Sequence, residues 1–108
     1  MTDKIVVLST CGDADEAGRI ARRLIEKRVA ACVNIVAGVR SIYRWQGSIE
    51  DSSEHLLIIK SSRPALEALQ AELRAAHSYA VPEIVALPIV DGSEDYLAWL
   101  GVELGEAS

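Results

Sequence analysis

The chain opens with an apolar segment, residues 4–11, that predicts a central β-strand. Its β-branched side chains, Ile5, Val6 and Val7, favour an extended backbone. Asp13, with a glutamate three residues later, predicts the start of a helix, because this pair can cap the first turn. Apolar residues then recur at helical spacing and predict one buried face, made of Ala17, Ile20, Ala21, Leu24 and Ile25.

A long second strand and a third strand follow this helix. Residues 29–36 have a strand pattern, which Gly38 interrupts and which resumes at Val39. Residues 46–48 predict a hairpin turn. Residues 49–61 then return as the third strand.

The end of the second strand is aromatic on one face. Ser41, Tyr43 and Trp45 share that face by alternation. Every aromatic side chain in this protein is Tyr or Trp, and these residues suit interfaces that are partly wet. A strand of this length exceeds what a domain of this size needs, so we expect residues 41–47 to be buried against another chain.

The second half of the chain predicts a helix, a strand and a helix. Residues 62–64 open the second helix, with a proline near its first position, and its end falls around His77. Residues 83–89 form a short strand, and Pro88 within it predicts an edge strand or a strand end. Ser93 is the expected cap of the last helix.

The order β-α-β-β-α-β-α predicts an α+β fold of the split β-α-β type, in one domain over residues 1–108. Its sheet has four antiparallel strands with the first and third in the centre, and two helices cover one face. The extra C-terminal helix can cover only part of the other face. The uncovered apolar face of the sheet and its exposed edges need to be buried, so we expect an oligomer.

The charge of the chain limits the classes of partner that it can be expected to bind. The formal net charge is −5, and basic residues cluster only within residues 19–28, as on a solvated helix face. We therefore expect no nucleic-acid partner, and an acidic protein is compatible with cations. No apolar run is long enough to cross a bilayer or to form a signal-peptide core, so we expect a cytoplasmic protein without a membrane partner.

Three chemistry-bearing residues are predicted to meet at one end of the sheet: Cys11, His77 and Glu83. The first strand ends at Cys11, the second helix returns to the same end at His77, and the fourth strand starts there. Thiolate, imidazole and carboxylate are ligands of copper and zinc. The alternative is structural, with a buried thiol, a histidine at a helix C-terminus and an ion-paired glutamate.

The remaining chemistry is sparse. Cys32 is expected to be packing, too far from Cys11 for a disulfide, because it starts the second strand at the opposite end of the sheet. We find no phosphate loop or hydrolase elbow, so we expect no organic cofactor and no enzymatic activity. A Cys11/His77 nucleophile pair is the catalytic alternative, without an orienting third group.

Four segments resemble the CutA divalent-cation tolerance family, in order and over nearly the whole chain. They are residues 30–35 (AACVNI), 41–47 (SIYRWQG), 77–84 (HSYAVPEI) and 96–100 (YLAWL). The resemblance implies a ferredoxin-like fold, a homotrimer with clefts between subunits, and a role in tolerance of copper and other divalent metals. It does not identify a protein partner.

The chain departs from the family pattern at several positions near the predicted metal site. Gly12 and Ser78 stand where prolines are usual, and Ala80 replaces a common glutamate or glutamine. Ser9 and Ala76 occupy positions where some members have cysteine and histidine. The resemblance to the PII signalling proteins gives a second hypothesis, a ligand-sensing or scaffold trimer whose cleft is lined by Tyr43, Trp45 and Lys60.

Overall fold

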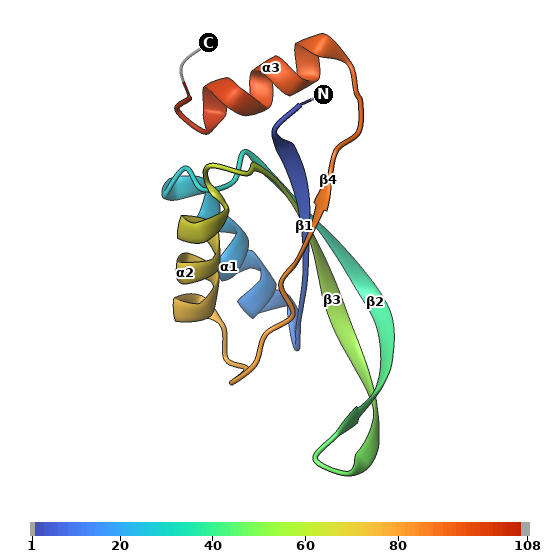
Figure 1. The fold of residues 1–108 in the computed structure, drawn as a ribbon. Coiled ribbons are helices and arrows are strands. Elements are labelled where there is room, and N and C mark those ends of the chain that lie inside the picture. The colour runs from blue at the N-terminus through green and yellow to red at the C-terminus, as the bar shows by residue number, and fades with distance from the viewer. Residues whose placement is uncertain (1, 107–108) are drawn as a thin grey trace.

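One antiparallel sheet organises the chain in the computed structural model, which describes residues 2–106. Its strand order is β2-β3-β1-β4, so β1 and β3 are central, as predicted. Both helices of the β-α-β units lie on one face, and the last helix lies across the end of the sheet where β1 begins (Figure 1). The elements are β1 (Lys4–Cys11), α1 (Ala14–Glu26), β2 (Cys32–Trp45), β3 (Ser48–Ser62), α2 (Leu66–Ala76), β4 (Val85–Pro88) and α3 (Glu94–Glu103).

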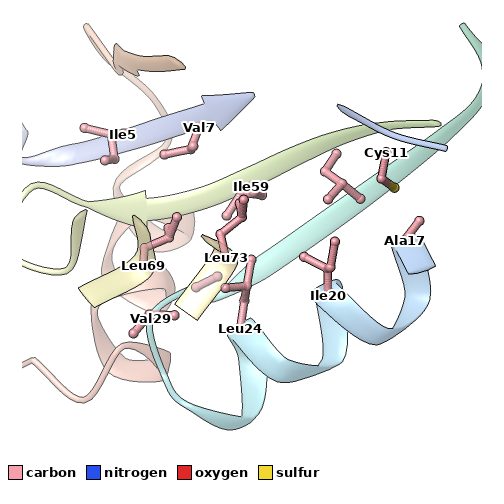
Figure 2. Close-up of a cluster of buried hydrophobic side chains, with 12 residues drawn as sticks. Ile5, Val7, Cys11, Ala17, Ile20, Leu24, Val29, Ile59, Leu69 and Leu73 are labelled. Carbon is pink, nitrogen blue, oxygen red and sulfur yellow. The ribbon is translucent and has the colours of Figure 1, made fainter. Parts of the chain in front are cut away.

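The hydrophobic core lies between the sheet and the pair α1 and α2. Figure 2 shows side chains of the central strands pointing toward the two helices. Burying each large aliphatic side chain contributes about 1.5–3 kcal/mol, so this one layer supplies most of the driving force for folding. Its fully buried members include Val7, Ile20, Leu24, Leu57, Ile59, Leu69 and Leu73.

Two helices begin at the caps that the sequence predicts. The Asp13 carboxylate accepts a 2.8 Å hydrogen bond from the backbone N–H of Glu16, and the Ser93 hydroxyl accepts one of 3.2 Å from Tyr96. The prediction for α2 is wrong by several residues, because Ser62 still pairs with Lys4 as the end of β3. This helix starts at residue 66 without a side-chain cap.

The second strand runs through Gly38 as one element, and its pairing with β3 is interrupted at Gly38 and resumes at Val39, as the sequence predicts. It begins at residue 32, not 29, and a bulge separates Val36 from Val39. Gly38 adopts a φ of 76°, which glycine tolerates without strain. The partners Leu56 and Glu54 lie on one face of β3, so the bulge keeps Val36 and Val39 on the same face despite their odd spacing.

The hairpin turn and the edge strand follow their sequence signals. Gln46 and Gly47 have φ values of 51° and 83°, and positive φ at both positions characterises the two-residue turns that match strand twist. Strand β4 is shorter than predicted, running over residues 85–88, and it ends on its proline at the edge of the sheet. The predicted edge or end position of Pro88 is confirmed.

The hairpin extends beyond the rest of the molecule. The pairing of β1 with β3 stops at Cys11 and His55, whereas β2 and β3 stay paired out to Trp45 and Ser48. The projecting ribbon is visible in Figure 1, and the longest dimension of the molecule is 47 Å against 25 and 22 Å. Of the helices within residues 2–106, none is long and apolar enough to cross a membrane.

Candidate functional site

Cys11 ends β1 inside the core. Its side chain is 0% exposed, and its Sγ lies 3.8 Å from the carbonyl oxygen of Asp13. Burial raises the pKa of this thiol to about 11, and the neighbouring carboxylates of Glu16, Asp13 and Glu54 act in the same direction. Cys11 is therefore a protonated, packed thiol at neutral pH, which is the structural alternative given by the sequence.

His77 follows α2 and joins it to β1. Its backbone N–H closes the last turn of the helix on Leu73, at 3.0 Å. The ring Nδ1 accepts a 3.0 Å hydrogen bond from the backbone N–H of Tyr79, so the proton resides on Nε2, which donates to the Thr10 carbonyl at 2.7 Å. Both ring nitrogens are engaged, and a metal ion would have to displace one of these bonds.

Glu16 makes a contact that the sequence did not reveal. It was expected only as part of the cap of α1, yet its side chain is buried and accepts a 2.8 Å hydrogen bond from the backbone N–H of Ser78. Burial, the largest influence, would raise the pKa of Glu16, but hydrogen bonds from Ser78, together with smaller contributions from His77 and Gly12, lower that pKa overall. The carboxylate thus holds the segment after α2 against the start of α1.

A groove of about 720 Å³ runs beside the projecting ribbon, and we call it the ribbon groove. Its walls include Tyr43, Trp45, Glu54, Tyr79 and Glu83. The Tyr79 hydroxyl donates a 2.8 Å hydrogen bond to Glu54. The volume falls in the range of small-molecule sites, and the walls combine aromatic rings with two carboxylates.

The predicted site residues do not all lie in one place. Glu83 lies in the ribbon groove with Tyr43 and Trp45, whereas Cys11 and His77 are buried and do not line the groove. Within the described part of one chain, no three or more His, Cys, Asp or Glu side chains are grouped so that they could hold a metal ion. The neighbourhood predicted for the end of β1 exists, but these three side chains do not converge on one point.

Lys60 lies far from the ribbon groove within one chain. It pairs with Cys32 across β2 and β3, at the opposite end of the sheet from the hairpin, and its ammonium donates to the side-chain oxygen of Asn34. A cleft containing Tyr43, Trp45 and Lys60 therefore needs more than one chain.

Two residues of the ribbon groove, Glu54 and Tyr79, were not predicted as site residues from the sequence. Glu54 is only 4% exposed although it sits in a polar stretch of the sequence. The signal that could have found Tyr79 is the resemblance, since it lies in the quoted segment 77–84. Their partnership is a tertiary contact across 25 residues of chain.

Residues 5–103 match the sequence profile of a family described as CutA1 divalent ion tolerance protein. This chain belongs to that family. It is 49% identical over 100 residues to the divalent-cation tolerance protein CutA of Thermus thermophilus, a match that covers 93% of this chain and 97% of the relative. The chloroplastic CutA protein of Arabidopsis thaliana is 45% identical over 96 residues, covering 89% of this chain and 53% of the relative. The chain thus spans about half the length of that plant protein.

Solved CutA structures have the same fold. The Thermus thermophilus protein superposes with a TM-score of 0.88 at 49% identity, covering 90% of this chain and 94% of the other. CutA from Xylella fastidiosa superposes with a TM-score of 0.93 at 39% identity, covering 95% and 99%. The predicted family and the predicted α+β fold are both confirmed.

Proposed function

We propose that this CutA-family chain acts in tolerance of divalent metal ions as a homotrimer that binds copper or another divalent cation directly. The observation that carries the proposal is the ribbon groove, which places Glu83 among aromatic side chains on a projecting ribbon. The role that we propose is binding, not catalysis, and a cation would have to displace the proton that the buried Cys11 thiol holds at neutral pH.

The trimer is supported by apolar surface that one chain leaves uncovered. The ribbon exposes Ile42, Trp45 and Ile49, with Trp45 45% exposed, and β4 exposes Val85 and Leu87. Apolar side chains exposed on both faces of a projecting ribbon and on an edge strand favour burial in a protein interface. Packing of three copies through the ribbons would cover these residues and would close the ribbon groove on its open side.

The metal ligands are proposed as Glu83 first, with Cys11 and His77 behind it. The Glu83 carboxylate is exposed on the groove wall. Oxygen, sulfur and imidazole donors together suit copper and zinc. Binding by His77 requires release of the N–H of Tyr79 or of the Thr10 carbonyl, so a cation would remodel the segment after α2.

Calorimetric titration of the intact protein with copper and with zinc tests this proposal. We expect binding by the wild type that is weakened in Glu83→Gln, Cys11→Ser and His77→Gln. Glu67→Gln, which removes an exposed carboxylate on α2, is the matched control and should bind as the wild type does. Equal affinity in all four variants would place the cation elsewhere, and no binding by the wild type would overturn direct binding.

The second candidate function is a trimer that binds a small organic ligand or a partner protein, without a direct metal role. The size and aromatic walls of the ribbon groove favour it. Thermal melting in metal-free buffer against a metabolite panel separates the two candidates. A ligand that raises the melting temperature, and loses this effect in Trp45→Ala, supports the second candidate. A flat response across the panel counts against it.

A further inference from the structure

A thiol and an amine face each other at the end of the sheet remote from the ribbon groove. Cys32, the first residue of β2, pairs directly with Lys60 of β3. Directly opposed residues lie on the same face of a sheet with neighbouring Cβ atoms. The Lys60 Nζ lies 4.0 Å from the Cys32 Sγ. The backbone register makes the two residues cross-strand neighbours, and the lysine side chain then brings its nitrogen to the sulfur.

The surroundings hold the amine near the sulfur. The Asn34 side-chain oxygen, on the same face of β2, accepts a hydrogen bond from the Lys60 ammonium. Tyr96 of α3 lies beside the thiol, since burial and then Cys32 raise the pKa of its hydroxyl. Both Cys32 and Lys60 are half-buried. A half-buried thiol can be reached by an oxidant as small as hydrogen peroxide.

The other cysteine has no comparable neighbour. Cys11 is fully buried among core side chains, and its pKa is raised to about 11. It lies at the opposite end of β1 from Val6, the residue that pairs with Lys60. Both cysteines are free, and the length of the sheet separates them. An oxidised Cys32 therefore cannot be captured by the second thiol of its own chain.

We propose that Cys32 and Lys60 form a reversible sulfur–nitrogen bond when the protein meets hydrogen peroxide. In the first step the Cys32 thiol is oxidised to a sulfenic acid, and the peroxide is reduced to water. In the second step the Lys60 ammonium releases one proton to solvent, and the neutral amine nitrogen attacks this sulfur. The S–N bond forms as the S–O bond breaks, and the oxygen leaves as water with one further hydrogen from the nitrogen.

The closeness of the Lys60 nitrogen to the Cys32 sulfur favours formation of the sulfur–nitrogen bond. Sulfenic acids condense with nitrogen nucleophiles or with thiols, and a nucleophile held beside the sulfur has a large advantage over one in solution. The bond removes the cationic charge of Lys60 and ties β2 covalently to β3 beneath α3. Reduction by an excess of external thiol restores both side chains, because two thiols supply the two hydrogens and leave as a disulfide.

Intact-mass spectrometry of the folded protein after peroxide treatment tests the proposal. We expect the wild-type mass to fall by two hydrogen atoms and to recover after thiol reduction. Digestion should yield a peptide with Cys32 joined to a peptide with Lys60. The Cys11→Ser variant should behave identically, which excludes an internal disulfide. Cys32→Ser should show no loss of mass.

The Lys60→Arg variant provides the decisive comparison, because it keeps the positive charge but removes the primary amine. We expect no cross-linked peptide and a severalfold increase in sulfenic acid trapped at Cys32 by a cyclic dione. The proposal is overturned if Lys60→Arg still loses two hydrogens, or if wild-type Cys32 simply gains two oxygens as a sulfinic acid. Joined Cys32 peptides from two subunits, as a disulfide, would overturn it as well.

Discussion

The Tyr79 hydroxyl donates a 2.8 Å hydrogen bond to the Glu54 carboxylate and ties the segment after α2 to β3. The carboxylate is almost fully buried, so this hydroxyl replaces the water that an exposed glutamate would have. Burial and then Glu54 raise the pKa of Tyr79 above its usual value. The pair forms one wall of the ribbon groove.

Removing this hydroxyl should destabilise the protein measurably. In Tyr79→Phe the Glu54 carboxylate is left buried without its partner, which costs about 1–3 kcal/mol in the free energy of unfolding. Urea unfolding checks the value. A double-mutant cycle with Glu54→Gln isolates the pair, and single effects that simply add would show that the two side chains are not coupled.

The same pair predicts sensitivity to alkaline pH. Because the folded-state pKa of Tyr79 is raised, the folded protein holds this proton where the unfolded chain releases it. The contribution of Tyr79 to stability is complete below the ordinary tyrosine pKa of about 10 and is lost as the pH rises above it. Melting temperatures across this range should decline less steeply in Tyr79→Phe than in the wild type, and parallel slopes would contradict the assignment.

Glu16 predicts the opposite behaviour in acid. Its folded-state pKa is lowered, so its contribution is complete above the ordinary glutamate pKa of about 4.3 and disappears as the pH falls through the lowered value. Glu16→Gln should therefore flatten the acid side of the stability profile. Glu72→Gln, which removes the surface partner of Arg23 at 2.8 Å, is the control. Arg23 lowers the pKa of Glu72 in the same direction, but solvent screens this surface pair, so the control should change the profile less than Glu16→Gln does. A larger effect in the control would refute the prediction.

Trp45 should matter for assembly more than for the fold of one chain. Its side chain lies at the tip of the ribbon, outside the core. In the proposed trimer it becomes a buried anchor, whose truncation costs about 2 kcal/mol or more. Trp45→Ala should lower the mass in solution from three chains of 11.7 kDa and make the melting temperature depend on protein concentration.

Arg44→Ala is the matched control for this prediction. Arg44 precedes Trp45 on the same strand and points to the other face. Its loss should leave the mass in solution unchanged. If Trp45→Ala also keeps the wild-type mass and melting temperature, the ribbon is not the assembly surface.

The two cysteines should differ sharply toward alkylating reagents. Cys11 is buried and its pKa of about 11 keeps the thiolate scarce, whereas Cys32 is half-buried. Timed alkylation followed by peptide mass spectrometry should label Cys32 first and label Cys11 only on unfolding. Rapid labelling of Cys11 in the folded protein would instead support the nucleophile pair with His77.

The local pattern of the sequence determined the elements and the order of the strands. Asp13 and Ser93 identified two helix starts, because caps depend on neighbouring residues alone. Pro88 identified a strand end for the same reason, because a proline has no backbone N–H to donate to a neighbouring strand. The alternation of Tyr43 and Trp45 identified the aromatic face, although the bulge at Gly38 decided which face of the sheet it joins.

The tertiary structure decided what each polar side chain does. The sequence brought Cys11, His77 and Glu83 to one end of the sheet, but the directions of their side chains depend on packing between segments far apart in the chain. His77 turns to the Thr10 carbonyl, Glu83 faces the ribbon groove, and Cys11 points into the core. The pairing of Cys32 with Lys60 was likewise set by strand register, which no local pattern specifies.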